Sequence, residues 1–398
     1  MCFVTVPHPL GMISKEEVNA KVDAAFDDIV KAATAWTPSK EKQDAQVKPY
    51  PAKRFKFSGT YADVNDMFQK RKWSLSLPIV PPTVDKVAAM LKGTTRNPAQ
   101  VLLVVPARQG MLTVMAGAKP EHMPLLIATV EAMADPVAAW RGPTTTTAAT
   151  VPVFFISGPI IEKLKLNPGT GTAGGENPVT NALGYFVNLV GDVVGGSVPP
   201  NFDKSTHGSS ADLVALVFTE NAKENPWKTT YAEEAGFKPG DSIVTHFSAY
   251  LGNANIDHDS KTGQRLLTTL STGLLGSASG LASCLADYDA TYAINNKVSF
   301  AFIVLCPEHA ATIAKDFPDQ RAARDFMRET AAMPYKFYSQ ETCVPGKDFG
   351  PYDENTFIPR FKKTESIKFF VSGGPGKQSQ IWVPFPQVFK PVSKKIAE

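Results

Sequence analysis

The chain has 398 residues, of which 43% are hydrophobic and 20% are charged, with 41 Lys and Arg against 38 Asp and Glu. This composition excludes an intrinsically disordered chain, and the nearly balanced charge excludes the dense basic face typical of proteins that bind nucleic acid or anionic membranes. The length exceeds the usual size of a single core, so we expect more than one domain. The low charged fraction favours self-association, and we therefore expect a homo-oligomer.

The sequence predicts a cytoplasmic protein with reduced thiols. No stretch of about 18 uncharged apolar residues could span a bilayer, and Met1 to Leu10 lacks the basic and apolar regions of a signal peptide. The four cysteines, Cys2, Cys284, Cys306 and Cys343, show no CxxC spacing and are too sparse for a disulfide scaffold or a structural zinc site.

The first predicted element is a helix over Ser14 to Trp36. Ser14 and Glu17 form a capping box, and one apolar stripe runs along the residues that follow. Residues 37–58 are polar and basic and contain prolines, which indicates a connecting arm. We therefore predict an N-terminal helix and arm over residues 1–58.

From residue 59 onward, short apolar runs typical of buried strands alternate with helical patterns. The expected strands are Val101–Val105, Val151–Ile156, Leu213–Phe218, Ser242–Phe247, Val298–Leu305 and Ile367–Val371. The expected helices include Val84–Leu91, Glu121–Met133, Val179–Val190, Thr262–Leu275, Glu308–Phe317 and Arg321–Ala332. This alternation predicts an α/β fold with mainly parallel sheets flanked by helices.

Two short fragments recur along the chain. FFISGP at Phe154–Pro159 is similar to FFVSGGP at Phe369–Pro375, and PEH occurs at Pro120–His122 and at Pro307–His309. An internal duplication would explain both matches, and chance similarity of short strings is the alternative. On the first interpretation we predict two related lobes, over residues 59–240 and 241–398, with a ligand site in the cleft between them.

Residues that follow the predicted strands are the candidate site, because ligands of open parallel sheets bind beyond the carboxyl ends of the strands. The clearest signal is SGGPGKQS at Ser372–Ser379, where glycines leave backbone N–H groups exposed and Lys377 adds a positive charge suited to a carboxylate or phosphate. It is not a P-loop, since Gln378 stands where Ser or Thr would bind magnesium. A tight structural turn is the alternative. The residues predicted to bind a small anion are Arg108, Ser157, Gly158, Gly373, Gly374, Gly376, Lys377 and Ser379.

The segment Cys306-Pro307-Glu308-His309 carries the strongest catalytic signal. Pro307 fits the first position of a helix, so Glu308 and His309 are expected in its first turn. The helix dipole lowers the pKa of a histidine there, which favours a neutral imidazole able to act as a base, and it gives Cys306 thiolate character. The structural alternatives are a favourable first-turn acid and a small buried cysteine.

The remaining histidines extend this hypothesis. Glu121 and His122 follow a proline in the first half as Glu308 and His309 do in the second, which completes the candidate catalytic set with Cys306. His246 is expected in the core, although a divalent metal ion held by His246, His122 and His309 stays open if the lobes face each other. The HExxH and GxSxG motifs of familiar hydrolases do not occur.

Several segments resemble a largely uncharacterised bacterial family of two-lobed proteins with WxxxLPIVPPT and MAGxxPExxP motifs. They are WSLSLPIVPPT at Trp73–Thr83, MAGAKPEHMPLLIA at Met115–Ala128, PEHA at Pro307–Ala310 and Ser372–Ser379, and the similarity covers most of residues 60–380. Members are often described alongside a small Cys- or selenocysteine-containing redox protein with a UGSC motif. The resemblance therefore implies redox or sulfur chemistry and a small redox partner. Ala118 stands where the family often has a cysteine.

The leading expectation is an enzyme that acts on a small anionic substrate by His/Glu acid–base chemistry of the lyase or hydratase type, since this chemistry needs only proton-transfer groups and an anion clamp. One alternative is a subunit of a thiol or selenol redox complex that uses Cys306. Another is a non-catalytic oligomeric binding protein. Neither nucleic acid nor a membrane is an expected partner.

Overall fold

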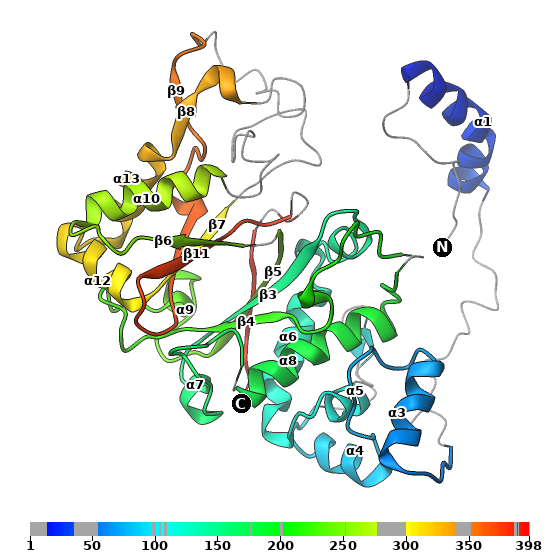
Figure 1. Cartoon of the computed structure of the whole chain (residues 1–398). Helices are drawn as coiled ribbons and strands as arrows, with labels where there is room; N and C mark the ends of the chain where they lie inside the picture. Colours follow the sequence, from blue (N-terminus) through cyan, green and yellow to red (C-terminus); the bar gives the residue numbers. More distant parts are fainter. Residues whose placement is uncertain are drawn as a thin grey trace. The chain divides into compact units, whose positions relative to one another are not determined.

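A computed structural model describes residues 14–35, 55–96, 101–102, 105–106, 110–175, 177–199, 202–250, 252–276, 300–338, 352–385, 388 and 390–397. The chain divides into two compact units, Met1–Lys56 and Phe57–Glu398 (Figure 1). The first unit contains α1 (Lys15–Thr34), and its capping box of Ser14 and Glu17 confirms the predicted start of this helix.

The second unit contains both helices and sheets, which confirms the predicted α/β class. Its first sheet has the order β12-β5-β3-β4 and contains β3 (Thr150–Ser157), β4 (Leu216–Thr219), β5 (Ile243–Tyr250) and β12 (Val392–Lys395). Its second sheet has the order β10-β7-β11-β6 and contains β6 (Asn253–Ile256), β7 (Ala301–Leu305), β10 (Ile367–Val371) and β11 (Gln378–Trp382).

The helices follow the predicted pattern closely. They include α3 (Tyr61–Lys70), α4 (Val84–Leu91), α5 (Gly110–Met115), α6 (Met123–Ala134), α7 (Ile160–Lys163), α8 (Pro178–Leu189), α9 (Tyr231–Glu234), α10 (Gly263–Gly276), α12 (Pro307–Asp316) and α13 (Gln320–Thr330). Two small antiparallel pairs complete the described elements, namely β1 (Val101–Leu102) with β2 (Val105–Pro106) and β8 (Ala332–Pro334) with β9 (Phe357–Pro359). The described residues of the predicted strand Val101–Val105 form this short pair and belong to neither large sheet.

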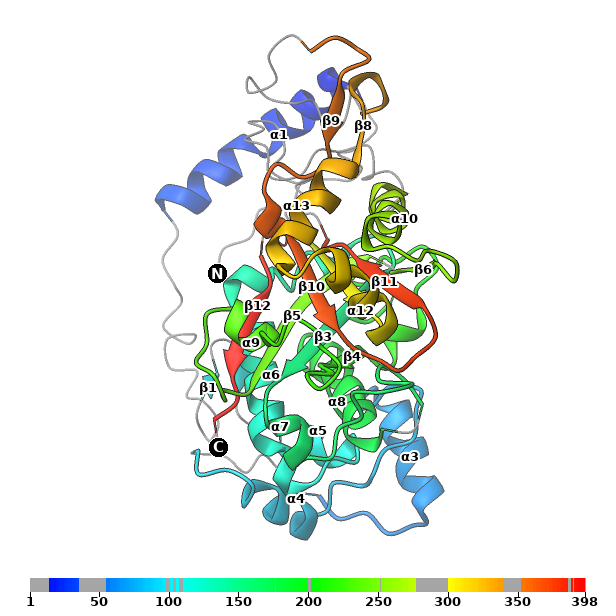
Figure 2. The same ribbon diagram turned by 90° about the vertical axis from the view of Figure 1, so that its left-hand side faces the viewer.

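The two large sheets pack face to face, and helices cover their outer faces (Figures 1 and 2). Successive residues of a strand point to opposite sides. On β3, Phe154 packs with α6 and α8 on the outer side, while Val153 and Phe155 pack on the inner side. The helices α10, α12 and α13 cover the second sheet in the same way. Both faces are buried, which is why these strands read as continuous apolar runs.

Aromatic side chains fill the space between the sheets. The ring centroid of Phe155 lies 4.5 Å from that of Phe302 and 4.9 Å from that of Phe370, and all three side chains are buried. Phe247 continues the stack on the first sheet. Where a cleft between two lobes was expected, the centre of the second unit is a packed aromatic core.

Both sheets are mixed, so the prediction of mainly parallel sheets is wrong. Among the described strands, only the pairs β3–β4 and β7–β10 are parallel, whereas β5 and β11 run antiparallel to β3 and β7. The physical reason is clearest in the second sheet, where residues 372–377 alone connect β10 to β11. A parallel return needs a crossover of about a dozen residues or more, so β11 must run opposite to β10.

The sheets exchange their edge strands. After β5 in the first sheet, the chain forms β6 at the edge of the second, and after β11 in the second sheet it forms β12 at the edge of the first. Residues 241–398 thus supply β5 and β12 to the sheet of residues 150–219, and the expected lobe boundary between 240 and 241 does not separate the two sheets. In the part of the chain that the structure describes, no helix has the length and apolar character needed to cross a membrane.

Candidate functional site

The junction between β7 and α12 carries the candidate reactive group. Cys306 is the N-cap residue of α12 with extended backbone angles, and Pro307 occupies the first helical position as predicted. His309 lies in the first turn. Cys306 is 5% exposed and His309 2% exposed, so both side chains are nearly enclosed. They lie at the carboxyl end of β7, where the sequence predicts a site.

Hydrogen bonds fix the orientation and the neutral tautomer of the His309 ring. Its Nε2 atom lies 3.1 Å from the carbonyl oxygen of Asp257, which can only accept, so Nε2 carries the proton. Its Nδ1 atom lies 2.8 Å from Oγ of Ser379 on β11. In the neutral ring Nδ1 is therefore the basic nitrogen, and it accepts the hydroxyl proton of Ser379. The Ser379 oxygen in turn accepts the backbone N–H of Cys306 at 3.3 Å.

Cys306 and His309 shift each other's pKa. Burial acts to raise the pKa of the Cys306 thiol, but the side chain and backbone of His309 and the backbone N–H of Gln378 outweigh it and hold this pKa below its usual value. Burial acts to lower the pKa of His309, but the Cys306 sulfur and the Asp257 carbonyl outweigh it, so the pKa is raised. The helix dipole was expected to lower this pKa, and the neighbouring sulfur reverses the effect. Both shifts favour the thiolate form of Cys306 and the protonated form of His309.

Glu308 holds the glycine-rich loop that follows β10. One oxygen of its carboxylate accepts the backbone N–H groups of Gly376 at 2.5 Å and Lys377 at 2.9 Å. These hydrogen bonds lower the pKa of Glu308, and the bond from Gly376 has the larger effect. The N–H groups expected to bind a substrate anion thus bind a carboxylate of the chain itself. The Lys377 ammonium donates to the carbonyl of His258 at 3.0 Å.

The first half of the same loop packs on residues 167–175. Gly373 has φ +84°, and its N–H donates to the carbonyl of Pro168 at 2.9 Å. A Cβ atom at Gly374 would lie 2.0 Å from Oγ1 of Thr170, so only glycine allows this contact. The packing of the loop on residues 167–175 therefore accounts for Gly373 and Gly374, and neither glycine needs a bound ligand to explain it.

Ser157 and Glu220 form a buried pair at the ends of β3 and β4. The Ser157 hydroxyl donates to Glu220 and accepts the N–H of Ala232 at 3.1 Å, while the other oxygen of Glu220 accepts the N–H of Tyr231 at 2.7 Å. Burial raises the pKa of Glu220 to about 7. The sequence places Glu220 just after the predicted strand Leu213–Phe218, but this residue was not included in the predicted site. Gly158 follows with φ +99°, in a tight turn.

The other candidate histidines lie on the helix-covered side of the first sheet. His122 is buried and accepts the N–H of Lys119 at 3.1 Å, and burial lowers its pKa, whereas Glu121 is exposed. His246 is completely buried and stacks on Phe154 with 4.5 Å between ring centroids, and burial lowers its pKa to about 3.

The structure does not bring these histidines to His309. Within the described ranges no group of three or more His, Cys, Asp or Glu residues is arranged to hold a metal ion. Arg108, the remaining predicted anion-binding residue, lies outside the described residues. The predicted residues that do meet are Cys306, Glu308, His309, Gly376, Lys377 and Ser379. Gln378 and Asp257 join them through their backbone groups.

The fold and this site define a mixed α/β protein with two facing sheets and a cysteine–histidine pair at the start of a helix. No protein-family model matches the chain, and no curated protein is detectably similar to it.

Proposed function

We propose that this chain is an enzyme that acts on a small anionic substrate with the Cys306–His309 pair as its reactive centre. The observation that carries the proposal is the placement of a buried cysteine at the N-cap and a buried histidine, held by Ser379 and Asp257, in the first turn of α12. The lowered pKa of the thiol and the raised pKa of the imidazole support it. A thiolate is the nucleophilic form of cysteine, and a protonated imidazole beside it can supply a proton to the substrate.

Glu308 takes a positioning role in this proposal. Its carboxylate is held ionised by the N–H groups of Gly376 and Lys377, so it is unsuited to donate a proton near neutral pH. The same contact supports an anionic substrate, because a carboxylate that displaced Glu308 would find two backbone N–H donors already positioned for an oxygen atom. After that exchange, the two N–H groups and the dipole of α12 would form an anion clamp next to a proton-transfer group, as a lyase or hydratase reaction requires.

The test is turnover by the purified full-length chain. Exchange of carbon-bound protons for deuterium in a panel of small hydroxy- and unsaturated carboxylates, followed by NMR, detects proton transfer without knowledge of the product. We expect Cys306→Ser and His309→Gln to abolish the exchange and His258→Gln, an exposed histidine nearby, to retain it. Full exchange in both site variants would refute the proposal.

A second candidate, a subunit of a thiol or selenol redox complex, is favoured by Cys306 itself. A thiolate at a helix N-terminus is the attacking group in thiol–disulfide exchange. In this case the chain forms a mixed disulfide at Cys306 with glutathione disulfide, used as a probe and read by mass spectrometry. If Cys306 forms no adduct at neutral pH while other cysteines of the chain do, this role is excluded.

We also propose that the second unit contains two related halves, as the sequence suggests. In each sheet a parallel pair is followed by an antiparallel strand and then by the exchanged edge strand. Just after β4 and β10, the N–H groups of Glu220 and Ser372 donate to the carbonyls of Ile156 and Leu305. The recurring FFISGP and FFVSGGP segments do not support the duplication, because β3 and β10 hold different places in their sheets. Superposition of the two sheets in an experimental structure tests the equivalence.

Self-association stays part of the proposal. Its support is the low charged fraction together with apolar side chains exposed on α1, where Val22 is 41%, Phe26 56% and Val30 41% exposed. Light scattering of the purified chain gives the oligomeric state, and a monomer at all concentrations would contradict the expectation.

A further inference from the structure

A pocket of about 660 Å³ opens where the two sheets meet at one edge of the second unit. Its lining comes from α9, from the amino-terminal end of β10 and from β12, and its apolar wall includes Val137, Phe237 and Phe300. This volume lies in the range of small-molecule sites. The pocket lies at the opposite end of β10 from Ser372, so it is separate from the Cys306 site.

Tyr231 places a hydrogen-bond donor in this pocket. The residue is 4% exposed and lines the pocket. Its hydroxyl has no hydrogen-bond partner among the described residues and is not one of the fully buried polar atoms that lack one, so it is accessible from the pocket. Burial first, and then the carboxylates of Glu234 and Glu220, raise the pKa of Tyr231, so the hydroxyl keeps its proton. A ligand with an acceptor oxygen would satisfy it.

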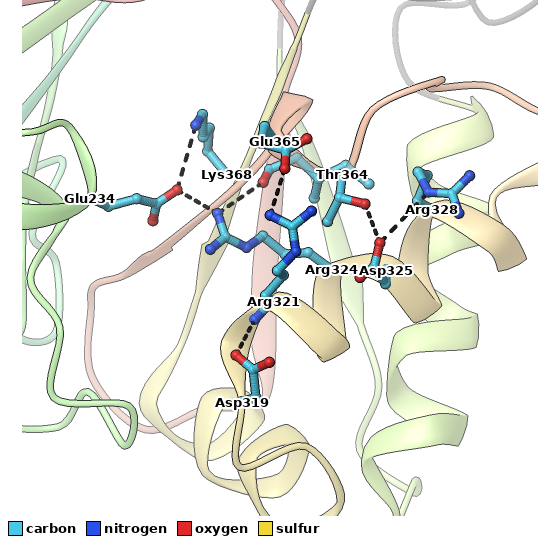
Figure 3. Close-up of polar contacts among 10 residues, drawn as sticks. Glu234, Asp319, Arg321, Arg324, Asp325, Arg328, Thr364, Glu365 and Lys368 are labelled. Atoms are coloured by element: carbon cyan, nitrogen blue, oxygen red, sulfur yellow. Dashed lines mark hydrogen bonds and ion pairs between the residues drawn. The ribbon is translucent and has the colours of Figure 1, made fainter.

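The acidic side chains that line the pocket are already paired. Figure 3 shows the network around two of them, Glu234 and Glu365, which lie beside the arginines of α13. The pairs are Glu234 with Arg324 and with Lys368 at 3.5 Å, Glu365 with Arg321 at 2.5 Å, and Asp135 with Lys394 at 2.7 Å. The carboxylates are therefore neutralised by neighbouring cations.

Two further lysines give the pocket a net positive charge. Lys363 and Lys390 line it, and neither forms an ion pair with another residue in the described part of the chain. The arrangement combines two ammonium groups, one hydroxyl donor and an apolar wall. We propose that this pocket binds a small organic anion with an apolar body, of the class of an aromatic carboxylate.

The probe is phenylacetate, titrated into the full-length protein at low ionic strength by isothermal titration calorimetry. Phenylacetamide has the same shape without the charge, and inorganic phosphate has charge without the apolar body. We expect phenylacetate to bind at least about tenfold more tightly than either, because a charge-assisted contact and the buried ring both contribute. Equal affinity for phenylacetate and phenylacetamide, or no binding of phenylacetate, would overturn the proposal.

Variants locate the site. Lys390→Ala and Tyr231→Phe should each weaken phenylacetate binding about tenfold, the loss expected for one charge-assisted hydrogen bond. Lys223→Ala, an exposed lysine that pairs with Glu162 away from the pocket, serves as the matched control and should leave the affinity unchanged. Cys306→Ser should also leave it unchanged, which separates this site from the proposed active centre. Unchanged binding in both pocket variants would refute the assignment.

Discussion

The lowered pKa of Cys306 predicts how the reactivity of this thiol depends on pH. Because the pKa of Cys306 lies below its usual value, its reaction with iodoacetamide should already be fast at pH 7 and should rise less steeply toward pH 9 than that of an ordinary thiol. His309→Gln removes the imidazole but leaves the sulfur buried at 5% exposure. Burial then weighs more heavily against the thiolate, and the pKa of the thiol should rise relative to the native chain.

The size of the effect follows from the interaction removed. A hydrogen bond to a charged group contributes about 1.5–3 kcal/mol, which changes the thiolate population at pH 7 by roughly 10- to 100-fold. The alkylation rate at Cys306 should fall by a similar factor in His309→Gln. Peptide mass spectrometry resolves Cys306 from Cys2, Cys284 and Cys343, so the native cysteines can be kept. His258→Gln, a substitution of an exposed histidine, is the matched control.

Two results would refute this reasoning. The first is a Cys306 that titrates in the native chain like an ordinary thiol. The second is a pH profile that His309→Gln leaves unchanged, because the imidazole could then not be the partner of the sulfur.

Three further predictions concern stability and the loop. Phe155→Ala should lower the free energy of unfolding by about 3–5 kcal/mol in urea denaturation, because it empties the centre of the aromatic core. The pKa of Glu220 is raised to about 7, so protonation stabilises the fold at low pH, and the free energy of unfolding should fall by about 3 kcal/mol between pH 4.5 and 7; Glu220→Gln should remove this dependence. Glu308→Ala should speed hydrogen exchange at Gly376 and Lys377, and unchanged exchange would show that the carboxylate does not hold the loop.

The sequence predicts the central strands because their signal is local. Residues Ile367–Val371 are a continuous apolar run, and β10 begins and ends where that run does. The edge strands β6, β11 and β12 were not predicted, since their sequences NANI, QSQIW and VSKK are short and largely polar. Such segments become strands only because a distant strand offers hydrogen bonds, and no local pattern records that partner.

In the candidate site, too, the local features could be predicted from the sequence and the long-range contacts could not. The start of α12 was predicted from Pro307, and with it the positions of Cys306 and His309, because helix-start signals act over a single turn. The hydrogen bonds of His309 to Ser379 and Asp257 cross 70 and 52 residues of sequence. They depend on how β11 pairs with β7 and β6, so the raised pKa of His309 could not be derived from the helix dipole alone.

The position of Ser379 under His309 follows from the register of β11. Side chains alternate along a strand, so Ser379 and Ile381 share one face and Gln380 takes the other. Ile381 packs in the core beneath α10, α12 and α13, and Trp382 packs between the sheets. A slip by one residue would expose Ile381 and turn Ser379 away from the imidazole. The apolar anchors of β11 therefore place the Ser379 hydroxyl at Nδ1 of His309, and this couples the packing of the second sheet to the orientation of the imidazole beside Cys306.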